Sequence, residues 1–156
     1  MEKDLDKYFM KKALLEAKKA YQKDEVPIGC VIVQNNKIIA RGHNLRECNH
    51  SSISHAEIIA INKANKKLNN WRLIDTTMYV TLEPCPMCAG AIFNSRISRV
   101  VYASKDEKYG SLGGVFNLFD IKSLNHHIEI KGGVLEEEST KLIKEFFKQK
   151  RNKKDI

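Results

Sequence analysis

Residues 83–92 read EPCPMCAGAI and place Cys85 and Cys88, two of the four cysteines in the 156-residue chain, three positions apart. This spacing puts both thiols on one face of a helix. The chain opens on the charged segment MEKDLDKYFM and has no apolar run of membrane-spanning length. We therefore expect a cytoplasmic protein, in which a structural disulfide is rare. The C-x-x-C pair then serves redox chemistry or forms half of a zinc site.

The other half of a zinc site lies upstream, in SHAEIIA at residues 54–60. His55 offers an imidazole nitrogen, which with two thiolates makes three protein ligands. A structural zinc site usually has four protein ligands, whereas a catalytic site keeps its fourth position for water. Glu57 follows two residues after His55. The chain therefore matches H-x-E…P-C-x-x-C, the signature of zinc nucleobase deaminases, in which the glutamate carries protons.

Each half of this pattern has a simpler interpretation when taken alone. Ser54-x-x-Glu57 is also a capping box ahead of the apolar run EIIAINKA, with Ser54 as the helix cap. A single C-x-x-C is weak support for a metal. The two halves together, with a strand between them and a proline before the first cysteine, favour zinc. We interpret Cys48 and His50 as loop residues and Cys30, in an apolar strand, as core.

The rest of the chain predicts a sheet covered by helices on both faces. Asn35 and Asn36 separate two apolar runs and predict a two-residue hairpin turn. Right-handed crossovers bring the two ligand-bearing helices onto one face, with their N-termini close together. From periodicity we predict helices at 5–21, 55–68, 85–94 and 136–151, strands at 29–34, 37–42, 76–82, 96–104 and within 127–135, and a glycine-bearing loop at 105–114.

Size and charge limit the possible partners. At 17.9 kDa the chain fits one domain, which we assign to residues 1–151, followed by a polar tail at 152–156 that frays. The chain has 27 basic and 19 acidic residues, for a net charge of +8. This balance favours a polyanionic partner.

Six segments resemble the bacterial tRNA-specific adenosine deaminase family, and the similarity extends from about residue 8 to residue 151. The resemblance implies a cytidine-deaminase-like three-layer α/β/α sandwich with a central mixed five-stranded sheet. It also implies a homodimer with one zinc ion per chain, and hydrolysis of adenosine to inosine at the wobble position of a tRNA anticodon. The segments are EVPIG (25–29), GHN (42–44), SHAEIIA (54–60), NWRLIDTTMYVTLEPCPMCAGAI (70–92), SRISRVVYASKD (95–106) and LNHHIEIKGGVLEEE (124–138).

The resemblance also implies roles for individual residues. His55, Cys85 and Cys88 match the zinc ligands, and Glu57 matches the proton shuttle. The implied substrate contacts are Asn44 at the base, Asp106 and Lys108 in the substrate loop, and Phe147 and Arg151 on the closing helix against the anticodon stem-loop. From the basic run on that helix we add Lys148 and Lys150 to Arg151 and Lys108 as candidate phosphate contacts.

Three departures from the family keep other hypotheses open. They are SSIS at 51–54, PCPMC at 84–88, which also occurs in guanine deaminases, and SLGGVFNLF at 111–119. A free-base or nucleoside deaminase, such as a guanine deaminase, is the second hypothesis. A structural zinc module that binds nucleic acid and a redox C-x-x-C protein are the third and fourth. The basic closing helix favours RNA, because a small neutral base needs no phosphate-binding surface.

Overall fold

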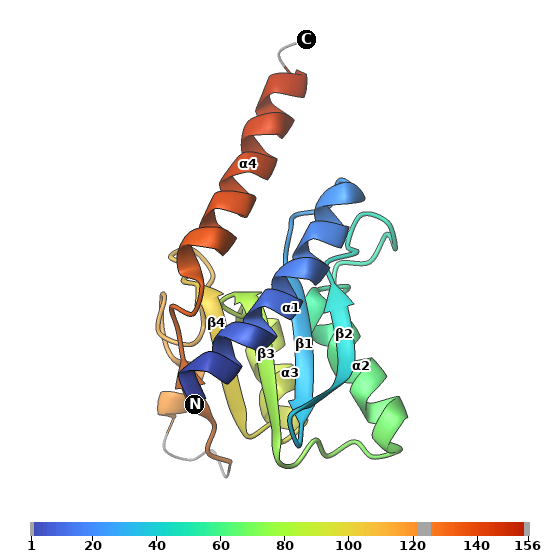
Figure 1. The fold of residues 1–156 in the computed structure, drawn as a ribbon, viewed down its shortest axis with the longest axis vertical. Helices are drawn as coiled ribbons and strands as arrows, with labels where there is room; N and C mark the ends of the chain where they lie inside the picture. The colour runs from blue at the N-terminus through green and yellow to red at the C-terminus, as the bar shows by residue number, and fades with distance from the viewer. Residues whose placement is uncertain (1, 122–125, 155–156) are drawn as a thin grey trace.

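A mixed five-stranded sheet in the order β2-β1-β3-β4-β5 forms the centre of the computed structural model, which describes residues 2–121 and 126–154 (Figure 1). β1 (Gly29–Gln34) is antiparallel to both β2 (Lys37–His43) and β3 (Thr76–Leu82). β4 (Arg99–Ser104) and β5 (Glu129–Lys131) continue the sheet parallel to β3. The predicted α/β fold with a mixed sheet is confirmed.

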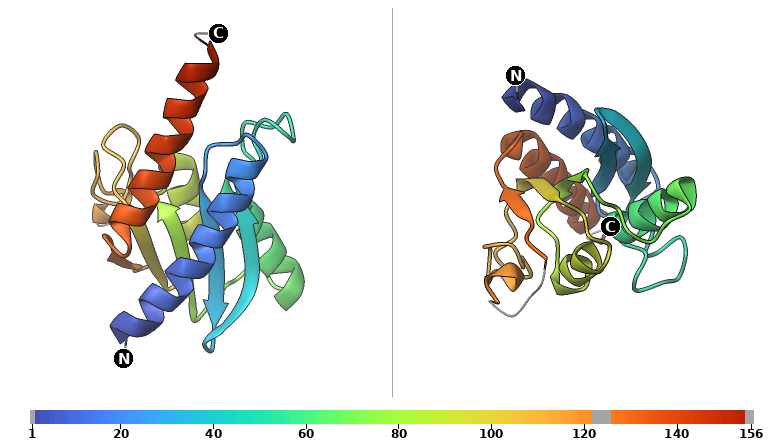
Figure 2. Two further views of the ribbon diagram at one scale, coloured as in Figure 1. Left: turned by 45° about the horizontal axis from the view of Figure 1, so that its top comes forward. Right: turned by 90° about the horizontal axis from the view of Figure 1, so that it is seen from below.

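Two helices cover each face of this sheet (Figure 2). α1 (Glu2–Gln22) and α4 (Glu136–Lys154) lie on one face, where they contact the central strands. α2 (Ala56–Leu68) and α3 (Pro86–Asn94) lie side by side on the other face. A short helix, η1 (Leu118–Asp120), packs beside α3. The predicted three layers are therefore present, and the two ligand-bearing helices share a face.

Strand alternation divides the core between the two faces. Val31 and Val33 belong to the cluster beneath α1, whereas Cys30 and Ile32 belong to the cluster shared with α2 and α3. Cys30 is fully buried, as predicted for a core residue. Successive strand residues point to opposite sides of a sheet, so the continuous apolar run of β1 serves both faces at once.

The β1–β2 hairpin turns through Asn35 and Asn36, whose φ angles are 52° and 60°. Two consecutive residues with positive φ define the type I′ turn, which matches the twist of paired strands and suits asparagine. Gln34 pairs with Lys37 across the turn, as predicted.

The start of α2 lies unusually close to β2. A β-carbon on Gly42 would be 2.5 Å from the Ala56 carbonyl oxygen and 2.9 Å from the Ala60 nitrogen. Only glycine opposite alanine allows helix and strand backbones to approach this closely. This contact fixes the first turn of α2, and with it the positions of His55 and Glu57.

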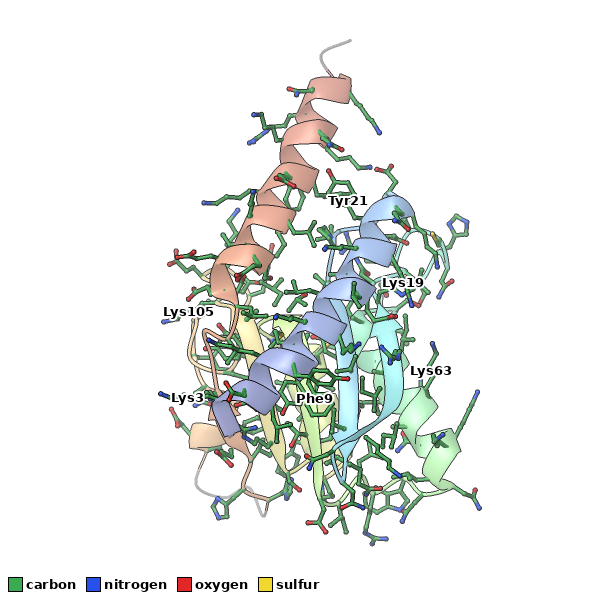
Figure 3. The ribbon with its side chains drawn as sticks, in the orientation of Figure 1. Lys3, Phe9, Lys19, Tyr21, Lys63 and Lys105 are labelled. Carbon is green, nitrogen blue, oxygen red and sulfur yellow. The ribbon has the colours of Figure 1, made fainter. Side chains whose placement is uncertain are left out.

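The first turns of α4 contact β3 and β4, and its later turns extend past the carboxyl ends of these strands (Figure 1). The ring of Tyr21, near the end of α1, lies 5.7 Å from the ring of Phe146 on α4, and Figure 3 shows Tyr21 on the side facing α4. The helix continues to Lys154, three residues beyond its predicted end. No helix in the described ranges is both long enough and apolar enough to span a membrane.

Asp6 connects α1 to three strands. Its side chain is 1% exposed and accepts hydrogen bonds at 2.8 Å from the Tyr79 hydroxyl, the Arg99 guanidinium and the Lys131 ammonium group. Burial alone raises the pKa of Asp6, but the hydrogen bonds from Arg99 and Lys131 outweigh it and hold the pKa well below its ordinary value.

We predict that Asp6→Asn lowers the free energy of unfolding at pH 7 by roughly 3 kcal/mol, because it removes the buried carboxylate that the partly buried Arg99 and Lys131 share. A lowered folded-state pKa stabilises the protein above the unfolded pKa of about 3.9, and this stabilisation is lost as pH falls toward the folded-state value. Urea unfolding should therefore show a smaller difference between the two proteins at pH 3 than at pH 7. Equal stabilities at pH 7 would contradict this role.

Candidate active site

His55 and Cys85 occupy the N-cap positions of α2 and α3, each with an extended backbone. Neither side chain caps its own helix, so both remain available to a ligand. The predicted capping role of Ser54 is wrong, because α2 begins one residue later and the Ser54 hydroxyl accepts a hydrogen bond from the Asn49 amide at 3.3 Å. Pro86 occupies the first turn of α3, where its missing N–H removes no helical hydrogen bond.

The three predicted ligands converge on one point. His55 Nδ1 lies 3.8 Å from Cys85 Sγ and 3.6 Å from Cys88 Sγ, and all three ligand atoms lie within 4.8 Å of one another. Tetrahedral zinc, with bonds of about 2.3 Å to sulfur and 2.0–2.1 Å to nitrogen, separates these atom types by about 3.6 Å. The donor set therefore fits one zinc ion without rearrangement. Within the described residues the group contains three ligands, which leaves a fourth position for water or substrate.

Hydrogen bonds within the cluster shift the pKa values of its three members. A hydrogen bond from Cys88 lowers the pKa of Cys85 to about 4, and the same contact, with burial, raises the pKa of Cys88. The hydrogen bond to Cys85 also raises the pKa of His55. One thiolate and one thiol thus share the site in the metal-free protein. A bound dication would stabilise both as thiolates, so binding releases protons.

Glu57 lies in the first turn of α2 and is 4% exposed. Burial raises the pKa of its carboxyl group, and the neighbouring Cys85 thiolate raises it further. A carboxyl group with a raised pKa can exchange protons near neutral pH, as a general acid and base must. Glu57 lines the same pocket as His55 and Cys85 and is not one of the three converging ligands.

A pocket of about 320 Å³ opens above these residues. This volume lies at the lower end of the range for small-molecule sites, about 300–1,000 Å³, so the pocket suits a single base and not a folded RNA. Five segments form the wall of the pocket: those that follow α1, β2, β3 and β4, and the one that leads into α2. The residues of the wall are Val26, Ile28, Asn44, Arg46, His55, Ala56, Glu57, Leu82, Glu83, Cys85, Asp106 and Tyr109.

Asn44 lines the pocket, as the sequence predicts, and its amide is held in a fixed orientation. Its Oδ1 atom accepts a hydrogen bond from the Arg46 backbone at 3.2 Å, and its Nδ2 atom donates to the Val26 carbonyl at 3.4 Å. Asn44 is therefore more than a turn residue, because a second N–H and a second lone pair remain to bind a polar base edge.

The loop after β4 contributes unequally to the pocket. Asp106 is a lining residue, and its Oδ1 atom accepts hydrogen bonds from the backbones of Lys108 and Tyr109 at 3.0 and 3.1 Å. The side chain of Lys108 is exposed and does not line the pocket. Tyr109, which sequence reasoning missed, lines the rim and is 67% exposed. Arg46, on the opposite rim, was also missed.

The residues predicted on α4 lie away from the pocket and do not share one face. Phe147 is 46% exposed and borders a shallow depression with Lys148 and Arg151, whereas Phe146 is the buried core residue. Lys150 turns toward the segment that follows α1, where its ammonium group lies 2.8 Å from Asp24. Lys150 and Arg151 therefore border different surface depressions, and their contacts with RNA stay predictions.

We predict that the purified protein binds one zinc ion per chain and that Cys88→Ala lowers zinc content at least tenfold, because only two of the three ligands remain. Elemental analysis after dialysis against a weak chelator measures this. Cys48→Ser is the matched control, since Cys48 is exposed and lies outside the cluster. Full zinc occupancy in Cys88→Ala would remove that residue from the ligand set.

Comparison with known proteins agrees with this geometry. The family of MafB19-like deaminases matches residues 4–151. A tRNA-specific adenosine deaminase from Bacillus subtilis is 52% identical over 149 residues, which cover 96% of this chain and 92% of that protein. A solved structure from a study of A-to-I editing by tRNA:A34 deaminases at the wobble position of transfer RNA is 39% identical, with a TM-score of 0.81 over 86% of this chain and 98% of that one.

A guanine deaminase structure from Bacillus subtilis is also similar, at 39% identity and a TM-score of 0.60, but the match covers only 63% of each chain. The match to the tRNA-specific adenosine deaminases covers nearly the whole chain and includes both halves of the ligand cluster. The resemblance read from the sequence is confirmed, and the chain belongs to the family of the tRNA-specific adenosine deaminases, within the MafB19-like deaminases.

Proposed function

We propose that this chain is a zinc-dependent hydrolase that converts adenosine to inosine at the wobble position of a tRNA anticodon. The observation that carries the proposal is the buried carboxyl group of Glu57 beside three convergent metal ligands, in a pocket sized for one base. The family supports the choice of substrate, since relatives 46–52% identical are tRNA-specific adenosine deaminases.

The reaction adds water to the adenine carbon that carries the amine and releases ammonia. His55, Cys85 and Cys88 would hold a zinc ion, which would supply the Lewis acidity that lowers the pKa of a bound water to about 7. The Glu57 carboxylate takes a proton from the attacking water and passes it to the ring nitrogen, and a second proton transfer gives the departing amine its hydrogen. Asn44, fixed by its two backbone contacts, orients the base. One water is consumed and one ammonia is formed for each inosine.

Recognition of a tRNA loop needs contacts outside the pocket. A base that is already unpaired in a loop is extruded at low cost, which favours loops over duplexes. Every RNA contains adenosine, so selectivity must come from flanking bases and the shape of the loop. Arg46 and Tyr109 on the rim are placed for flanking nucleotides, and Phe147, Lys148 and Arg151 on α4 for stacking and phosphate contacts.

The PCPMC departure does not extend to the pocket. Pro86 occupies the first turn of α3, and Met87 is 36% exposed. Neither residue lines the pocket. Pro86 and Met87 therefore support no change of substrate, and guanine deamination remains the second candidate through the shared zinc chemistry and the similar guanine deaminase structure.

We further propose that the protein works as a cytoplasmic homodimer. Ile53, Val115 and Phe116 are exposed apolar residues on the two loops whose other residues line the pocket, at 56%, 56% and 45% exposure. Exposed apolar patches often mark protein interfaces, and the adjacent Val115 and Phe116 would lie at the centre of the proposed one. A second copy covering these loops would add its own surface to the RNA-binding site.

We predict that Glu57→Gln retains zinc and binds tRNA but lowers kcat by about 10²–10⁴-fold, because general acid–base catalysis is lost. Inosine formation in a tRNA substrate and ammonia release measure the rate. Glu47→Gln, an exposed glutamate on the neighbouring loop, is the matched control. A near wild-type rate would exclude Glu57 from the chemistry, and brisk deamination of free guanine with no action on tRNA would favour the second candidate.

We predict that Lys148→Ala with Arg151→Ala weakens tRNA binding and flattens its salt dependence by a slope of roughly 0.7 for each lost phosphate contact. Lys150→Ala should have a smaller effect, because the Lys150 charge already pairs with Asp24. Titration of tRNA at several salt concentrations measures both, and zinc content should stay constant. Wild-type binding by the double variant would make this part of α4 a solvated helix end.

A further inference from the structure

Glu83 is a buried carboxylate that neither the metal site nor the proton transfer uses. It follows β3, two residues before Cys85, and is 2% exposed. Its Oε2 atom accepts hydrogen bonds from the backbones of Leu112 and Gly114 at 2.9 and 2.8 Å, and its Oε1 atom accepts one from the Asp106 backbone at 3.1 Å. All three donors belong to residues 105–117, here called the rim loop, which connects β4 to η1.

The rim loop folds tightly around this carboxylate. A β-carbon on either Gly110 or Gly114 would lie 2.3 Å from the Asp106 carbonyl oxygen. It would also lie 2.4 Å from Glu83 Oε2 at Gly110 and 2.6 Å from Glu83 Oε1 at Gly114. Neither glycine has a positive φ angle. Close approach, and not backbone conformation, therefore requires glycine at both positions. The two glycines therefore let the loop pack closely on its own Asp106 backbone and on the Glu83 carboxylate together.

The same loop supplies the pocket with Asp106 and Tyr109. The Asp106 backbone N–H is bound to Glu83, while the Asp106 side chain binds the Tyr109 backbone. The chain of contacts thus runs from Glu83 through Asp106 to the exposed ring of Tyr109. A second contact, from the Ser111 backbone to the Pro84 carbonyl at 3.0 Å, joins the loop to the segment that leads into the metal helix.

We propose that Glu83 is a positioning residue for substrate: its carboxylate holds the rim loop so that Asp106 and Tyr109 stand at the mouth of the pocket, against the nucleotides that flank the reacting base. The substrate named here rests on the proposed function, whereas the anchoring of the loop does not. Glu83 sets binding of substrate and leaves the chemical step to Glu57.

Hydrogen exchange tests the anchoring without any substrate. In wild type the amides of Asp106, Leu112 and Gly114 should exchange slowly, because each donates to a buried acceptor. Glu83→Gln places an N–H₂ group against at least one of these donors, so exchange across residues 105–117 should accelerate at least tenfold. Gly114→Ala should do the same by crowding both the Asp106 carbonyl oxygen and the Glu83 carboxylate, whereas Gly90→Ala, whose β-carbon would meet no atom within 4 Å, should not. Unchanged exchange in both test variants would overturn the proposal.

Steady-state kinetics distinguish a role of Glu83 in substrate binding from a role at the metal site. Glu83→Gln should raise KM for a tRNA substrate roughly tenfold, with kcat within about twofold of wild type and zinc content unchanged. In a Tyr109→Ala background, Glu83→Gln should raise KM by a clearly smaller factor. Glu25→Gln is the matched control, because Glu25 is equally buried but binds the backbones of Glu47 and Cys48 on the opposite rim. The effect of Glu25→Gln on KM should therefore be additive with that of Tyr109→Ala.

Two kinetic results would overturn the proposal even if exchange accelerates. A fall in kcat together with loss of zinc would show that Glu83 acts through Cys85. Full additivity with Tyr109→Ala would show that its effect does not pass through the rim loop. If wild type fails to act on tRNA, the proposed function fails, and the exchange measurement still decides whether Glu83 anchors the loop.

Discussion

The structure depends on the meeting of two helix N-termini at one end of the sheet. His55 and Cys85 are each the last extended residue before a helix, so each side chain leaves the backbone where the positive end of the helix dipole lies. This position stabilises a thiolate and brings Cys88, one turn into α3, alongside its partners. The backbone contact between Gly42 and Ala56 sets how far α2 can move from this point. Displacing either helix start would separate the ligands.

The buried glutamates around this ligand cluster have two different roles. Glu57 faces the cluster and has a raised pKa, as a proton carrier requires. Glu25 and Glu83 instead accept hydrogen bonds from backbone N–H groups of the two rim segments. Loops cannot satisfy their own backbone groups when buried, so a carboxylate that accepts several of these bonds is an efficient anchor. Different glutamates therefore serve the ligand cluster and the two rim segments of the pocket.

The sequence predicts well whatever depends on short-range pattern. The ligand set of His55, Cys85 and Cys88, the asparagine hairpin turn and the order of helices and strands all follow from local spacing or resemblance, and the structure brings these residues together as expected. The homology-based position of Asn44 in the pocket also agrees. Residues a few positions apart in the chain determine most of these features. The right-handed crossover rule determines that the two ligand-bearing helices share a face of the sheet.

Features that depend on contacts between distant segments were missed or placed wrongly. Lys150 pairs with Asp24, 126 positions away, and no local pattern marks that pair. Ser54 satisfies the capping-box pattern, but the helix begins at the metal ligand instead. Tyr109 and Arg46 carry no motif of their own, and they line the pocket on loops in which their backbones donate to Asp106 and Asn44. The polar end of α4 gave no sign that the helix would continue to Lys154.

The central claim is a catalytic zinc centre with three protein ligands and an open fourth position. X-ray absorption at the zinc edge of the reconstituted protein tests it directly. The account predicts two sulfur neighbours at about 2.3 Å and two nitrogen or oxygen neighbours at about 2.0–2.1 Å, one of which exchanges with solvent. A shell of three or more sulfur atoms, or four protein donors with no exchangeable neighbour, would contradict it and indicate a structural zinc site.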